Sequence, residues 1–297
     1  MTASPSPWIV GVDLLPDSAG ALAWTAWLVE RGGARREDVA AVCVVEEPRL
    51  IPLHGVTRER VVESVRQSVA SAIEASAARD AIGDIEIQVH PSVHDALWDA
   101  ARRRGAALVI GRLARRGEQR LVRLGKTARR LLRELPAPVV VVPPDVRRHE
   151  VGAGPVVIAV DTREETLAAV RFGRALAASI DRRHVIAHVL PTTVDLTFGY
   201  LSPARAQELH DEHEARAREA FATFVVRHGL VGDPSAVLLG PPVEALCDYA
   251  ARERAAAIVC GSRLLGAAAR LVSASVGSEL AAASTLPVAV VPPDLPP

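Results

Sequence analysis

Residues 8–13 read WIVGVD and residues 156–161 read VVIAVD, so a short apolar run ending in an aspartate recurs 148 residues later. Two further pairs recur in the same order and at nearly the same offset: AALVIG at 106–111 with AAIVCG at 256–261, and PAPVVVVPPD at 136–145 with TLPVAVVPPD at 285–294. Ordered repetition at a fixed spacing indicates that one structural unit has been duplicated. The sequence therefore predicts two similar domains, 1–148 and 149–297, joined by the polar, glycine-containing stretch 147–155.

Each half alternates short apolar runs with longer amphipathic segments. Strands are expected at 8–13, 39–45, 85–89, 107–111 and 138–142, and again at 155–160, 184–190, 235–239, 256–260 and 287–291. Helices are expected at 18–31, 57–80, 92–104 and 119–134, and again at 164–180, 203–228, 242–254 and 273–284. Runs that are apolar throughout suit a sheet covered on both faces. The pattern predicts an α/β fold with two tandem, doubly wound, parallel five-stranded sheets of Rossmann-like type.

The composition is that of a soluble globular protein, with 49% hydrophobic and 24% charged residues. No apolar run approaches the roughly 20 residues of a membrane-spanning helix, and the N-terminus lacks the pattern of a signal peptide. The cysteines, Cys43, Cys247 and Cys260, are too few and too scattered for a disulfide framework or a zinc site. A reducing cytoplasm, without membrane association, is the expected location.

The charges balance over the whole chain but not within each half. Lys+Arg and Asp+Glu number 35 each, which argues against binding to nucleic acid or anionic membranes by charge alone. Residues 1–148 carry 22 basic and 18 acidic groups, whereas residues 149–297 carry 13 and 17. The stretch from Arg102 to Arg133 is strongly basic, with Glu118 as its only acid. Because it contains no aromatic side chain for base stacking, nucleic-acid binding is not expected.

In a doubly wound sheet, ligands bind beyond the carboxyl ends of the strands, where the strand order switches. The loops after the first and fourth strands of each half are therefore the candidate site. Asp13 and Asp161 end the first strands, where a carboxylate can accept hydrogen bonds from a ribose or an adenine amine. A turn or helix-capping role is equally typical of aspartate at such a position.

The loops after the fourth strands have the composition of an anion site. Gly111 and Gly261 follow these strands, and small or hydroxyl residues stand near the next expected helix starts. Backbone N–H groups at such a start can bind an anion. Lys126 is the only lysine in the chain and stands at this position in the first half, where it could meet a phosphate as a point charge. The alternative is a solvated helical face.

Together these segments resemble the universal stress protein family in its tandem, two-domain form. The resemblance rests on the first strand with its aspartate, on Ser18 and Thr166 five residues later, on the glycine loop after strand four and on the P-x-P-V-x-V-V last strand. It implies the adenine nucleotide alpha hydrolase-like variant of the fold, a non-enzymatic role in stress response and ATP as the cofactor. No catalytic residue is expected, and ATP hydrolysis would at most be slow.

In the nucleotide-binding branch of that family the loop reads G-x2-G-x9-G-[ST]. Carried over residue by residue, the resemblance assigns ATP contacts to Asp13, Val44, Gly111, Gly125, Lys126 and Thr127 in the first half, and to Asp161, Val189, Gly261 and Ser275 in the second. Ala114 replaces the middle glycine of the first loop, and Leu264 and Ala274 replace two glycines of the second. Two functions stay open: an adenine-nucleotide sensor, with the first half the better candidate, and a ligand-free interaction module that has lost both ATP loops.

Other motifs are interpreted as structural. Gly125-Lys126-Thr127 is not a P-loop, because Arg120 stands where that motif needs a glycine. The stripe His210, His213 and Glu214 has a chelating spacing without forming H-E-x-x-H, so no metal site is expected. His94-Asp95 is expected to open a helix with Ser92 or Asp95 in its first turn, and the strand residues His184 and His188 are expected to be structural.

The last strand of each half provides an expected interface. By resemblance, family domains pair through this strand, so 139–142 and 288–291 are expected to pair within the chain as a pseudo-dimer. Such pairing would cover two exposed sheet edges. A homodimer of whole chains is compatible with the same resemblance.

Overall fold

The computed structural model describes residues 7–15, 18–50, 57–113, 124–135, 137–190, 202–262 and 276–294. The first half contains strands β1 (Trp8–Gly11), β2 (Val39–Glu46), β3 (Asp84–His90), β4 (Ala107–Gly111) and β5 (Val139–Val142), with helices α1 (Ala19–Glu30), α2 (Arg58–Ala75), α3 (Val93–Arg104) and α4 (Lys126–Glu134). The second half contains strands β6 (Val156–Val160), β7 (His184–Leu190), β8 (Ser235–Leu239), β9 (Ala257–Gly261) and β10 (Val288–Val291), with helices α5 (Leu167–Ser179), α6 (Pro203–Arg227), α7 (Pro242–Arg252) and α8 (Val276–Ala283).

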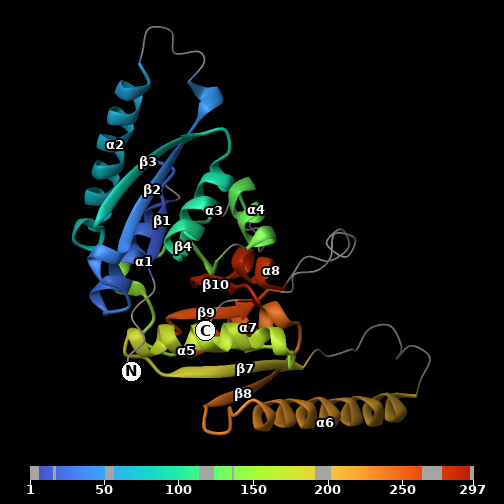
Figure 1. The fold of residues 1–297 in the computed structure, drawn as a ribbon. Helices are drawn as coiled ribbons and strands as arrows, with labels where there is room; N and C mark the ends of the chain where they lie inside the picture. Colours follow the sequence, from blue (N-terminus) through green and yellow to red (C-terminus); the bar gives the residue numbers. More distant parts are fainter. Residues whose placement is uncertain are drawn as a thin grey trace.

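The strands of both halves join in one ten-stranded sheet of order β3-β2-β1-β4-β5-β10-β9-β6-β7-β8 (Figure 1). Within each half the neighbouring strands run parallel, and the order switches between β1 and β4 or between β6 and β9. At the centre, β5 and β10 run antiparallel, with Val139 opposite Val290 and Val141 opposite Val288. The predicted fold class is confirmed, and the antiparallel pairing of the last strands makes the two sheets continuous.

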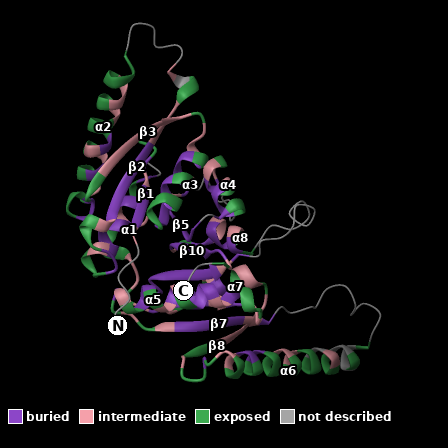
Figure 2. Cartoon of the chain, viewed as in Figure 1, coloured by how far each residue is buried: buried purple, intermediate pink, exposed green. Residues whose placement is uncertain are grey.

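Helices cover both faces of this sheet, and each face has its own apolar core. One core takes its helical residues from α1, α2, α5 and α6, and the other takes them from α3, α4, α7 and α8. The strands between are buried along most of their length, except for the edge strands β3 and β8, which are half-buried or exposed (Figure 2). Both cores include residues from both halves, and the Trp8 ring lies 6.3 Å from the ring of Phe172 in α5. Among the described helices, none is long and apolar enough to cross a membrane.

Local signals explain where the helices begin and end. Ser92 accepts a hydrogen bond from the Asp95 N–H at the start of α3, and Gly105 ends that helix with a left-handed backbone at φ 57°. The helix expected at 57–80 instead ends at Ala75, and Ala77 reverses the chain with φ 51°. The helix expected from residue 119 begins only at Lys126, because Gly125 is extended; residues 119–123 lie outside the described ranges.

Candidate functional site

A cavity of about 480 Å³ opens where β1, β2 and β4 end, beside the switch in strand order of the first half. Its volume is in the range of small-molecule sites. Its lining includes the predicted site residues Asp13, Val44, Gly111, Lys126 and Thr127. Gly125 is not part of the lining but directly precedes Lys126 as the cap of α4. The structure thus brings together the ends of three strands and the start of α4.

The loop after β1 holds Asp13 at the cavity. The Leu15 N–H donates to Asp13 Oδ1 over 3.0 Å, and the Ser18 hydroxyl donates to the Leu15 carbonyl over 2.9 Å. Between them Leu14 adopts a left-handed backbone with φ 61°, a conformation that a non-glycine residue rarely takes. Asp13 therefore has the turn role that the sequence allowed for it, and it also lines the cavity.

The start of α4 forms the positive side of the cavity. Gly125 is extended and provides no side-chain cap, and the first turn of α4 contains no acidic residue. Unsatisfied N–H groups and the helix dipole make such a start favourable for an anion. Lys126 is exposed and Thr127 half-buried, and both line the cavity. An anionic group of a ligand would meet the N–H groups, the ammonium and the hydroxyl together.

Part of the cavity lining is apolar. Val44 and Ile110 come from the sheet, and Val93 and Leu97 come from the first turns of α3. Cys43 also lines the cavity, and burial, with a further contribution from Asp13, raises the pKa of its thiol to about 11. The thiol is therefore protonated at neutral pH and contributes apolar surface, since the nucleophilic form is the thiolate.

Sequence reasoning did not find the contribution of Cys43, Val93 and Leu97. Cys43 precedes Val44 on β2, and the two α3 residues begin the helix after β3. A usable signal exists, because residues that begin a helix just after a strand lie at the carboxyl edge of the sheet. Apolar residues at such a helix start could therefore have been assigned to the cavity wall.

The second half repeats the turn after its first strand. The Arg163 N–H donates to Asp161 Oδ1 over 3.3 Å, Thr162 is left-handed with φ 64°, and the Thr166 hydroxyl donates to the Arg163 carbonyl over 2.6 Å. These contacts match those of Asp13, Leu14 and Ser18. The duplicated aspartates therefore hold the same turn.

The remaining residues predicted for the second site are only partly brought together. Val189 lies near the end of β7 and Gly261 ends β9, and both are half-buried. Gly261 packs on the start of α5, where a Cβ would lie 3.4 Å from the Thr166 Cα. Ser275 lies outside the described residues.

An aromatic pair stands beside the crevice of the second half. His188 lies opposite Val160 in the register of β6 and β7, the place that Cys43 takes relative to Val12 in the first half. The His188 ring stacks on Phe221 of α6, with centroids 4.9 Å apart and planes inclined by 11°. Since a carbonyl can only accept, the His188 Nδ1–H donates to the Val160 carbonyl over 2.8 Å. Both side chains are buried, which agrees with the structural role expected for His188.

Comparison with known proteins identifies the class. The model of the universal stress protein family matches twice, at residues 8–143 and 153–292. The chain belongs to the universal stress protein family and contains two copies of its domain in tandem. A comparison with curated proteins found no match.

Solved structures show the same fold. A universal stress protein from Archaeoglobus fulgidus DSM 4304 superposes with a TM-score of 0.64 at 16% identity, over 96% of this chain and 98% of that chain. A functionally unknown protein from Pseudomonas aeruginosa PAO1 also gives a TM-score of 0.64 at 16% identity, over 99% and 94%. A universal stress protein solved in complex with cAMP is 26% identical over 46% of this chain and 96% of that chain; its TM-score of 0.30 is too low to bear on the fold.

Proposed function

We propose that the first half binds one adenine nucleotide, with ATP as the preferred ligand, and that the protein is a non-enzymatic sensor in stress response. The observation that carries the proposal is the cavity itself. It joins a carboxylate, an apolar wall and a basic helix start at the switch in strand order. These are the chemical groups that a sugar, a base and phosphates respectively need.

Each part of the cavity suits one part of the ligand. The apolar side at Val44, Leu97 and Ile110 can cover a base, and strand ends at this edge expose backbone groups to its rim. Asp13 has one carboxylate oxygen engaged in the turn, and its second oxygen can accept from a ribose hydroxyl. Lys126 and the first N–H groups of α4 then receive the phosphates.

The same lining supports binding rather than turnover. Its titratable side chains are Asp13, Cys43, Glu46 and Lys126 among the described residues. Asp13 is engaged in the turn, and the thiol of Cys43 has a raised pKa. A general base for water attack must be held against the nucleophile, whereas the Asp13 carboxylate is held against the Leu15 N–H. We therefore infer that any ATP hydrolysis is slow.

The second half is proposed to be a ligand-free structural module. The stacked pair of His188 and Phe221 beside its crevice favours this role. The proposal thus assigns the sensor to the first half and the alternative function, an interaction module, to the second. We also propose that the protein is cytoplasmic, which cell fractionation would test. We further propose that whole chains form a homodimer, which light scattering would test.

Equilibrium dialysis of the full chain with labelled ATP tests the proposal. We expect one nucleotide per chain, bound about tenfold more weakly by Lys126→Ala, because a hydrogen bond to a charged group contributes about 1.5–3 kcal/mol. The matched control is Arg129→Ala, which removes an exposed positive charge from α4 outside the cavity lining. Asp161→Ala should leave the affinity unchanged. Equal losses in Lys126→Ala and Arg129→Ala, or no binding at millimolar ATP, would overturn the proposal.

A further inference from the structure

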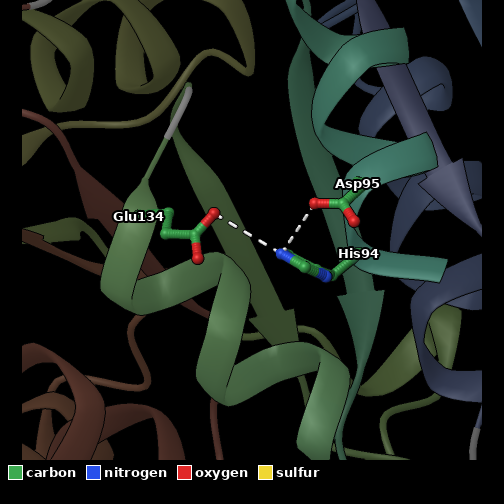
Figure 3. Close-up of side chains that lie close together, drawn as sticks. All are labelled: His94, Asp95 and Glu134. Carbon is green, nitrogen blue, oxygen red and sulfur yellow. Dashed lines mark ion pairs between the residues drawn. The ribbon is translucent and has the colours of Figure 1, made fainter. Parts of the chain in front are cut away.

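Outside the cavity, a cluster of polar side chains connects helix α3 with helix α4. His94 and Asp95 lie in the first turn of α3, and Glu134 is the last residue of α4 (Figure 3). His94 Nε2 lies 3.0 Å from Asp95 Oδ1 and 3.5 Å from Glu134 Oε2. The three ligand-type atoms lie within 4.8 Å of one another. None of the three residues lines the nucleotide cavity.

The distances within the cluster match those between two ligands of one divalent cation. In a tetrahedral zinc site with metal–ligand bonds of about 2.1 Å, two ligand atoms lie about 3.4 Å apart. The two distances from His94 Nε2, 3.0 and 3.5 Å, lie on either side of this value. The imidazole is also fixed in place, since its side chain is 10% exposed, whereas the Asp95 and Glu134 side chains are 52% and 41% exposed and can adjust.

Ser92 contacts the second nitrogen of the His94 imidazole. Its Oγ lies 2.8 Å from His94 Nδ1 and accepts the Asp95 N–H over 3.5 Å. When Nε2 binds a metal, Nδ1 must carry the proton and needs an acceptor, which Ser92 Oγ can be. A partner of this kind orients a histidine ligand and raises its affinity for the metal. The helix cap that the sequence predicted at Ser92 thus has a second use.

Arg130 competes with this arrangement. Its Nη1 lies 3.4 Å from His94 Nδ1, and a guanidinium can only donate. In the metal-free protein, Nδ1 therefore accepts from Arg130 while Nε2–H donates to Asp95. Metal binding reverses the tautomer, so the Arg130 contact must be lost. Arg130 acts against the metal both through its hydrogen bond and through its charge.

We propose that His94, Asp95 and Glu134 bind one Zn²⁺ ion, with solvent at the fourth position. One imidazole and two carboxylates are ligands that zinc accepts, and the two negative charges match the dication. The ion would join the first turn of α3 to the last turn of α4. This site departs from the sequence expectation of no metal, and it does not depend on nucleotide binding.

Titration of the chelator-stripped full chain with Zn²⁺ against a chromophoric chelator tests the site. We expect one tight equivalent, weakened about tenfold or more in Glu134→Gln and in Asp95→Asn. Asp99→Asn is the matched control, because it removes an exposed carboxylate from the same helix, one turn further on. Arg130→Gln should tighten binding about threefold or more, since the competing donor and charge are gone.

Circular dichroism establishes that each variant is folded, and both changed carboxylates are exposed. The Arg130 variant distinguishes a metal site from a cluster of ion pairs. If Arg130 only stabilised such a cluster, its removal would not strengthen zinc binding. A tight equivalent that survives in both Glu134→Gln and Asp95→Asn overturns the proposal. A second pair of results would also overturn it. These are a zinc affinity in Arg130→Gln equal to that of the unaltered chain, together with a zinc affinity in Glu134→Gln equal to that in Asp99→Asn.

Discussion

The crevices of the two halves share a backbone and differ in the side chains beside it. Both use an aspartate turn with a left-handed residue, Leu14 or Thr162, just after the first strand. At the matching position of the second strand, one half has Cys43 and the other has His188. Cys43 lines the cavity, whereas His188 is stacked on Phe221.

This difference teaches that the turn and the ligand site are separable. The hydrogen bonds of Asp13 and Asp161 hold the chain after β1 and β6 alike, so their duplication is explained by the turn alone. The cavities beside the two turns differ in their lining: Asp13 lines the one in the first half, whereas the one of about 430 Å³ in the second half is lined by Thr162, Glu164 and residues of α6 and not by Asp161. A repeated motif residue is therefore evidence for a repeated backbone, and function has to be argued from the side chains that line each cavity.

The largest expected effect concerns the packing of α1 in the first half and of α5 in the second. A Cβ on Gly20 of α1 would lie 2.0 Å from the Pro143 carbonyl oxygen, a backbone atom that cannot move aside. The matching residue of α5 is Ala168, which is buried. Gly20→Ala should lower the free energy of unfolding by about 3 kcal/mol, whereas Ala168→Gly should cost about 1 kcal/mol. Urea denaturation measures both, and equal losses would show that α1 does not pack more closely than α5.

The next effect concerns the opposite edge of the sheet, where the halves also differ. His184 Nε2 lies 2.8 Å from Asp233, which also pairs with Arg174, whereas the matching strand position of the first half is the buried Val39. Burial raises the pKa of the Asp233 carboxyl, but the hydrogen bonds from His184 and Arg174 outweigh it, so that the pKa is lowered. The carboxylate therefore stabilises the fold above the unfolded-state pKa of about 3.9.

It follows that this stabilisation is complete at neutral pH and is lost as the pH falls below about 4 through the lowered pKa. Asp233→Asn should cost about 2 kcal/mol at pH 7 and should show a weaker loss of stability on acidification than the unaltered chain. Denaturation curves at pH 7 and at several values below 4 measure this. The control Asp248→Asn changes an exposed carboxylate of the same half. An identical pH dependence for both variants would mean that the Asp233 pairs are not stabilising.

The difference between Cys43 and His188 can be tested by exchange. Cys43→His places the ring of the second half into the first cavity, where its Nδ1–H can donate to the Val12 carbonyl as His188 does to Val160. The ring would occupy the space next to Val44, so ATP affinity should fall about tenfold, or about 1.4 kcal/mol. His188→Cys is the control and should leave that affinity unchanged. If Cys43→His folds and binds ATP normally, side-chain size at this position does not decide the difference.

Most of the fold could be predicted from the sequence, because apolar strand runs are local patterns and the 148-residue repeat is visible when the two halves are compared. The helix expected at 119–134 is shorter in the structure, because Gly125 is extended and α4 begins after it. The break at Ala77 was equally hidden, since a left-handed alanine has no sequence signature. Both errors lie where backbone conformation overrides helical periodicity.

The site could be predicted only in part. The rule for switch points correctly placed Asp13, Gly111 and Lys126 at one edge, because it depends on topology. It could not separate the two crevices, since the contact of His188 with Phe221 joins residues far apart in the sequence. The His94–Glu134 pair was missed for the same reason, whereas its helix cap, a local feature, was predicted.

The smallest expected effect uses two buried thiols as reporters of the two halves. Burial raises the pKa of Cys43 to about 11, with Asp13 adding to it, and that of Cys260 to about 12. At pH 8 about one Cys43 thiol in a thousand is ionised, so both should react slowly with iodoacetamide compared with the half-buried Cys247. ATP in the first cavity should slow the labelling of Cys43 about threefold further and leave Cys260 unchanged, as measured by mass spectrometry of the cysteine peptides. Equal protection of Cys43 and Cys260 would indicate a general stabilisation of the fold, and protection of Cys260 alone would place the nucleotide in the second half.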